Sequence, residues 1–173
     1  MLKIIDNLLK ELFPLNRSIT GKDNKKTLQI IQSIIPLKIM NFKSGTKVFD
    51  WKIPDEWNIK NAWIKDNKNK KIVDFKKSNL HVMSYSKPIY KNKIKSSQFI
   101  NKLSYLKNIP NAIPYRTSYY NRDWGFCVTK FQYDLIKNNK NNFELFIDSK
   151  FNKNGNMPYG EILIKGKSKT EIL

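Results

Sequence analysis

The chain has 173 residues, 40% of them hydrophobic, which is enough for one domain with its own core. It carries 33 basic and 14 acidic residues, a formal net charge of +19, but only three of the basic residues are arginine. Because lysine and asparagine occur in mixed runs, we attribute most of this charge to AT-rich coding rather than to nucleic-acid binding, which usually relies on arginine. No segment approaches the ~20 apolar residues of a membrane span.

Two short helices are predicted at the N-terminus. Apolar residues recur at helical spacing from residue 2 to 12, and Pro14 follows. A second helix is predicted to begin at Asp23 or Asn24 and to end at Pro36. A turn-rich loop joins the two helices.

The pattern then changes to strands. We predict strands at 37–41 and 47–51 around a Ser44-Gly45 turn, a hairpin of 58–64 with 70–75, and a strand at 80–84. Between them, Asp55 and Glu56 are expected to start a helical turn around Trp57.

The second half of the chain mixes both element types. A short helix capped by Ser96, a strand at 125–128, a helix from Thr129 to Lys137, a hairpin of 142–151 with 157–165 across Asn154-Gly155, and a strand from 170 are predicted in this order. The chain as a whole is therefore expected to be α+β.

Metal ligands are scarce. His81 is the only histidine and Cys127 the only cysteine, and they lie far apart in the sequence. A zinc site needs at least three protein ligands, so this chain alone is not expected to bind a metal. A metal site formed by the carboxylates of Asp50, Asp55 and Glu56 is the weaker alternative.

The lone cysteine excludes an internal disulfide and favours a reducing compartment. We therefore predict a cytoplasmic protein.

Neither His81 nor Cys127 has an obvious catalytic partner. Cys127, between Phe126 and Val128, is predicted to be a buried strand residue rather than a reactive thiol. His81 is interpreted as a hydrogen-bonded structural histidine, or as a pocket-lining residue that Asn79 and Tyr85 orient.

Two segments could bind an anion. Ser18, Thr20 and Gly21 precede the second helix beside Arg17, where a helix N-terminus could hold an anion or simply be capped. The loop after Pro114 concentrates rings and arginines that could bind a carboxylate or a ring, or could only pin the loop: Tyr115, Arg116, Tyr119, Tyr120, Arg122 and Trp124.

Several motifs occur together in a characteristic order. They are FPLNRSITG (13–21), SGTKVFDW (44–51), PDEWNI (54–59), SNLHV (78–82), AIPYRTSYY (112–120), WGFC (124–127) and YGE (159–161). This series resembles a bacterial zinc-aminopeptidase-like family that has long been labelled a domain of unknown function and is often found near polysaccharide-biosynthesis genes. The resemblance spans nearly the whole chain.

The resemblance implies an α/β peptidase domain of the di-zinc aminopeptidase type, with a β-rich domain inserted near its start. Residues 1–40 would begin the peptidase domain, 41–168 would be the insert, and 169–173 would re-enter the peptidase sheet. The zinc ligands and the general base would follow in the missing C-terminal part of the same domain. The chain is therefore expected to be an N-terminal fragment, inactive and without zinc by itself.

The complete family protein would hydrolyse a peptide bond, or the amide of a small substrate, with metal-activated water. No catalytic residue carries over to this chain. Substrate contacts are expected from His81, Tyr115, Arg116, Tyr119, Tyr120 and Trp124. A non-catalytic binding module that uses the aromatic and arginine loop is the second hypothesis, and a basic nucleic-acid-binding protein is the third.

Overall fold

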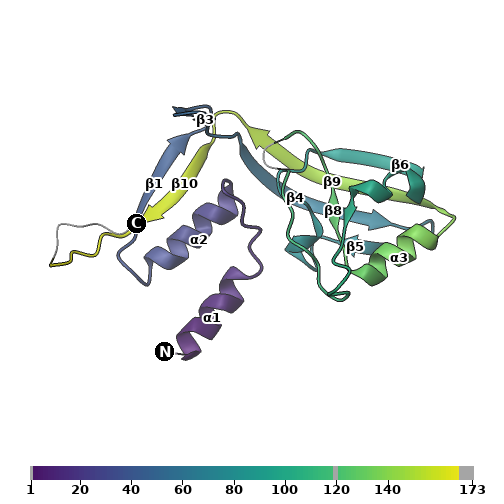
Figure 1. The fold of residues 1–173 in the computed structure, drawn as a ribbon, viewed down its shortest axis with the longest axis horizontal. Coiled ribbons are helices and arrows are strands. Elements are labelled where there is room, and N and C mark those ends of the chain that lie inside the picture. Colours follow the sequence, from purple (N-terminus) through teal and green to yellow (C-terminus); the bar gives the residue numbers. More distant parts are fainter. Residues whose placement is uncertain (1, 119–120, 168–173) are drawn as a thin grey trace.

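The computed structural model describes residues 2–118 and 121–167, in which three α-helices and ten strands form an α+β fold (Figure 1). Figure 1 shows two parts. The body, on the right, holds the largest sheet and helix α3. The helical part, on the left, holds helices α1 and α2 with a two-stranded ribbon. The strand predicted from residue 170 lies outside the described residues.

The body is built on a four-stranded antiparallel sheet in the order β5-β4-β9-β6. Its strands are β4 (Glu56–Lys65), β5 (Lys71–Asp74), β6 (Ile89–Lys95) and β9 (Asn142–Asn152). Alternate side chains of β9 are buried, as the two-residue period of a strand with one covered face requires. The predicted hairpin of 58–64 with 70–75 is confirmed. The predicted helical turn at Trp57 is wrong, because this residue lies in β4 with its ring in the core.

Short elements cover the inner face of this sheet. They are the parallel pair β7 (Leu103–Ser104) and β8 (Phe126–Cys127), helix α3 (Lys130–Asn138), and the 3-10 turns η1 (Asn79–His81), η2 (Ser96–Gln98) and η3 (Ile100–Lys102). Helix α3 begins as predicted at Thr129, whose hydroxyl accepts from the Gln132 N–H in a capping box. The helix predicted after Ser96 is only the pair of turns η2 and η3.

The helical part contains α1 (Leu2–Leu12), α2 (Lys22–Gln32) and an antiparallel pair of β1 (Lys38–Lys43) with β10 (Asn156–Glu161). The first helix is confirmed. The second differs at both ends, since Gly21 is its N-cap and it stops before Pro36. Neither Asp23 nor Asn24 is needed as a cap, because the Asn58 side chain of β4 accepts from the first helical N–H at Lys22, at 2.9 Å.

Three predictions about strands differ from the structure. The segment 47–51 is split into β2 (Lys47–Val48) and β3 (Trp51–Lys52), which pair with each other across a turn where Phe49 has φ 52°. Segment 80–84 forms only the isolated bridges of Val82 and Ser84 after η1. Strand β10 pairs with β1 and not with β9.

The two parts meet at a seam of hydrogen bonds. The Thr20 hydroxyl accepts from the Trp57 N–H at 3.0 Å and shares a 2.8 Å hydrogen bond with the Tyr85 hydroxyl. Strand β1 spans the predicted border at residues 40 and 41 and pairs with β10, which lies inside the predicted insert. The domain borders stay a prediction.

Candidate functional site

The candidate site is organised around the segment 78–86, which crosses the body between β8 and two loops. Its Met83 N–H donates to the carbonyl of Gly125 at 3.1 Å, and its Ser84 N–H donates to the carbonyl of Arg116 at 2.8 Å. On its other side the Asn79 side chain donates to the carbonyls of Phe13 and Leu15, at 2.7 and 2.9 Å. One rigid segment therefore positions both the 13–17 loop and the 114–118 loop.

The first hollow, which we name the Trp124 groove, has a volume of about 370 Å³. That volume lies in the range of small-ligand sites. Its lining is Met83, Asn101, Lys102, Ser104, Tyr115, Arg116, Thr117, Asp123, Trp124 and Gly125. The Lys102 ammonium donates to both carboxylate oxygens of Asp123, at 2.7 and 2.9 Å, and lies 5.9 Å from the centroid of the Trp124 ring. This wall is polar, charged and fixed by its own contacts.

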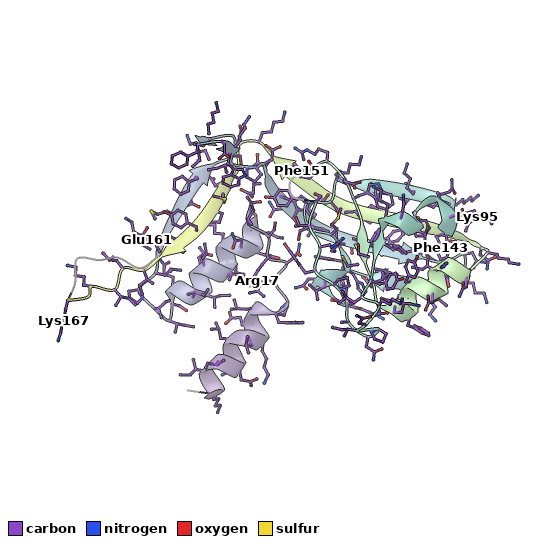
Figure 2. All side chains as sticks on the ribbon, in the orientation of Figure 1. Arg17, Lys95, Phe143, Phe151, Glu161 and Lys167 are labelled. Carbon is purple, nitrogen blue, oxygen red and sulfur yellow. The ribbon has the colours of Figure 1, made fainter. Side chains whose placement is uncertain are left out.

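The second hollow, the Arg17 groove, has a volume of about 280 Å³ and shares Tyr115 with the first. Its lining is Phe13, Leu15, Asn16, Arg17, Asn79, Leu80, Val82, Ser84 and Tyr115. Figure 2 shows Arg17 in the loop between the two N-terminal helices, on the side that faces the body. The two grooves therefore meet at Tyr115. The Arg17 groove is mostly apolar with a single arginine, and the Trp124 groove is mostly polar.

The three arginines are used differently. Arg122 pairs with Asp55 and lies with its guanidinium 3.5 Å from the centroid of the Phe151 ring, so it ties a loop to the sheet. Arg17 and Arg116 are exposed, and neither guanidinium has an ion-pair or hydrogen-bond partner among residues 2–118 and 121–167. The two grooves therefore each present one unengaged arginine.

The structure brings only part of the predicted substrate-binding set together. Tyr115, Arg116 and Trp124 line the Trp124 groove, whereas His81, within segment 78–86, is buried and lines neither groove. Tyr119 and Tyr120 lie outside the described residues. The predicted binding role of these residues stays a prediction.

Sequence reasoning did not place Asn101, Lys102 and Asp123 in this groove. Asn101 and Lys102 come from η3, about 20 residues upstream of the loop that carries Asp123, and no local pattern links them. The resemblance motif FPLNRSITG contained Arg17 and was the one signal that pointed to the second groove.

His81 is a structural histidine. It is 5% exposed, and its Nδ1 donates to the carbonyl of Cys127 at 2.8 Å, since a carbonyl can only accept. Asn79 and Tyr85 do not orient it, because the Asn79 side chain binds the 13–17 loop and the Tyr85 hydroxyl binds Thr20.

The thiol of Cys127 is buried, as predicted. Burial raises the pKa of this thiol to about 12, which leaves it unreactive.

Acid is expected to destabilise the protein through His81. Burial lowers the pKa of His81 below its ordinary value of 6.5. The unfolded chain therefore takes up a proton below about pH 6.5 while the native chain does not, and stability is lost as the pH falls towards the folded pKa. Urea unfolding at pH 7.5, 6.5 and 5.5 measures this slope. His81→Asn should flatten it, and an unchanged slope would contradict a buried neutral imidazole.

The predicted metal site is not formed by the side chains concerned. Among residues 2–118 and 121–167, no three His, Cys, Asp or Glu side chains are close enough to hold a metal ion. Asp55 pairs with Arg122, and Glu56 accepts from Asn58 and from the Asn156 N–H. At the N-terminus of α2, Asn58 accepts from the Lys22 N–H and the Thr20 hydroxyl is engaged with Trp57 and Tyr85, which favours capping, while anion binding there stays a prediction. None of the helices in the described ranges has the length and hydrophobicity that crossing a bilayer requires.

Residues 56–150, more than half of the chain, match the family described as "Domain of unknown function (DUF2172)". The chain belongs to this family. The DUF2172 match includes segment 78–86 and the whole lining of the Trp124 groove, whereas α1, α2 and Arg17 precede it.

Two relatives extend the comparison. The chain is 47% identical over 173 residues to a Clostridium acetobutylicum protein named "Putative polysaccharide biosynthesis protein with aminopeptidase-like domain", covering 98% of this chain and 38% of the relative. A crystal structure of a "putative peptidase" from the same species matches with a TM-score of 0.81 and 45% identity, over 89% of this chain and 36% of that one. The DUF2172 chain thus spans less than two fifths of these relatives, and their names support the aminopeptidase-like resemblance.

Proposed function

We propose that this chain is the DUF2172-containing part of a zinc-dependent aminopeptidase-like hydrolase, in which it binds and orients the substrate. The observation that carries the proposal is the 47% identity, over 98% of the chain, to a protein that has an aminopeptidase-like domain. The alignment leaves most of that relative unmatched, which provides room for a separate catalytic centre. The substrate is a peptide or a small molecule that bears an amide.

The roles follow from the groove. Zinc in such a hydrolase supplies an activated water, and we assign its ligands to the remainder of the longer protein. This chain contributes binding: Trp124 and Tyr115 present rings, Arg116 presents a guanidinium, and the Lys102–Asp123 pair holds the wall in place. Binding energy from groups remote from the reacting bond can be used to orient it, which accelerates the reaction.

The helical part supports a larger assembly. Ile4, Leu9 and Phe13 of helix α1 and its last turn are 61%, 61% and 69% exposed. Ile164, beyond strand β10, is 82% exposed. Several large apolar side chains exposed on one part of a protein usually indicate a surface that packs against another body. We propose that the remainder of the aminopeptidase-like protein covers it.

A chimera tests the function. This chain replaces the matched 38% of the Clostridium relative, and release of amine from aminoacyl and N-acyl-sugar substrates is measured with zinc and after chelation. We expect the chimera to show zinc-dependent activity within tenfold of the unmodified relative.

Two variants of the chimera test the role of the groove. Arg116→Ala should lower kcat/KM by tenfold or more. Lys153→Ala, in the exposed β9–β10 turn, should leave kcat/KM unchanged. A folded, inactive chimera of an active relative would refute the proposal, as would an unmodified relative that hydrolyses none of these amides.

A further inference from the structure

We propose that the Trp124 groove and the Arg17 groove form one site for an acidic disaccharide, with one carboxylate on Arg116 and one on Arg17. This narrows the amide-bearing substrate proposed above to one whose sugar part is an acidic disaccharide, and it rests on the proposed function only for the link to hydrolysis. The binding step itself is a property of this chain.

The arginines point to carboxylates. Among 33 basic residues only three are arginine, and the two that are not engaged in the fold both line these grooves. Lysine would suffice for a diffuse positive field. A guanidinium adds a planar fork that binds a carboxylate through two parallel hydrogen bonds, which an ammonium cannot do.

The Trp124 groove suits a sugar ring better than a peptide. The indole stands edge-on against Phe126, with ring centroids 6.4 Å apart, and this contact fixes its orientation. Asn101, Ser104 and Asp123, whose side chains carry an amide, a hydroxyl and a carboxylate, line the same groove. A sugar ring offers a face of C–H groups and an edge of hydroxyls that match these partners. Peptides in grooves are held by backbone pairing to a strand, by apolar side-chain pockets or, for acidic motifs, by arginine clusters, and the dipeptide Glu-Glu in the titration tests that last mode.

One residue joins the two grooves. Tyr115 lines both grooves, its side chain is 59% exposed, and it precedes Arg116 directly. The loops that carry Arg17 and Arg116 are both hydrogen-bonded to segment 78–86, through Asn79 on one side and Ser84 on the other. The two guanidinium groups therefore extend from loops that are already positioned, which reduces the entropy cost of binding. Each groove has room for one hexose ring, so the ligand spans two units.

Calorimetric titration of the full 173-residue chain tests the inference. The probes are digalacturonate, the neutral disaccharide galactobiose, and the acidic dipeptide Glu-Glu. We expect digalacturonate to bind at least tenfold more tightly than either of the others, and more weakly as salt is raised. Arg116→Gln and Arg17→Gln should each weaken binding tenfold or more, and Arg116→Lys should restore only part of it. Lys153→Gln removes the same charge far from both grooves and should change Kd less than twofold.

Three results would overturn the inference: equal affinity for galactobiose, equal or tighter binding of Glu-Glu, or wild-type affinity in both arginine variants. Because the titration involves no hydrolysis, its outcome is separate from that of the chimera. Sugar binding with an inactive chimera would refute only the hydrolase. An active chimera whose chain ignores digalacturonate would refute only the acidic-sugar site.

Discussion

Replacing Trp57 with alanine is expected to lower the free energy of unfolding by about 3–5 kcal/mol, the range for removing a large buried aromatic ring. Trp57 is 2% exposed and stacks on Tyr85 with ring centroids 5.7 Å apart. Its indole N–H donates to the carbonyl of Ser86 at 2.9 Å, and its backbone N–H donates to Thr20. The substitution keeps that backbone N–H but removes core volume, the ring packed against Tyr85 and the hydrogen bond to segment 78–86.

Two further variants separate these causes. Trp57→Phe keeps most of the ring volume and loses the indole hydrogen bond, so we expect it to lower the free energy of unfolding by roughly 1–3 kcal/mol. Trp63→Ala, on the same strand but only half-buried, should cost less than Trp57→Ala. Urea unfolding of all three chains measures the differences. If Trp57→Ala and Trp63→Ala were equally destabilised, the central position assigned to Trp57 would be wrong.

Gly21→Ala is expected to destabilise the protein by about 3 kcal/mol or more, through strain and overpacking together. Gly21 has φ +93°, a conformation that L side chains rarely adopt. A Cβ there would lie 2.3 Å from the backbone oxygen of Trp57, so the start of α2 would have to move away from β4. The 13–17 loop precedes this point directly. We therefore also expect weaker binding of digalacturonate in the Arg17 groove.

Gly45 provides the matched control. Its φ is +86°, but an added Cβ would meet only the flexible Lys52 side chain, at 3.7 Å. Gly45→Ala should therefore cost only the backbone strain, about 1 kcal/mol, and should leave ligand binding intact. Comparison of the two unfolding curves isolates the clash with Trp57. If both variants lost the same free energy of unfolding, backbone strain alone would explain the effect of Gly21→Ala. The contact between the start of α2 and β4 would then tolerate the displacement.

Elements with strong local signals were predictable. The hairpin of β4 and β5 consists of two apolar-rich runs on either side of a Lys-Asn turn, and helix α3 carries the Thr129 cap with Gln132 three residues on. The burial of Cys127 also followed from its apolar neighbours. In the hairpin and in helix α3, the residues that stabilise the element lie within about a dozen positions of one another.

The wrong predictions involve partners that are distant in sequence. Strand β10 follows β9 after a tight turn and would form a hairpin on local grounds, but it pairs with β1, more than a hundred residues upstream. Trp57 follows two acidic residues that resemble a helix start, yet sheet pairing with β9 places it in a strand. Burial and pairing overrode local propensity at both positions.

From the sequence alone came the α+β class, the scarcity of metal ligands and the family resemblance, because composition and ordered motifs are properties of the chain itself. The tertiary structure alone decided that Arg17 and Arg116 lie in adjoining grooves, that Arg122 is engaged elsewhere, and that His81 is buried. Arg17 and Arg116 are about a hundred positions apart, and only their hydrogen bonds to segment 78–86 bring them to one site. Long-range pairing of this kind has no local signature, since its free energy arises only when the whole fold is formed.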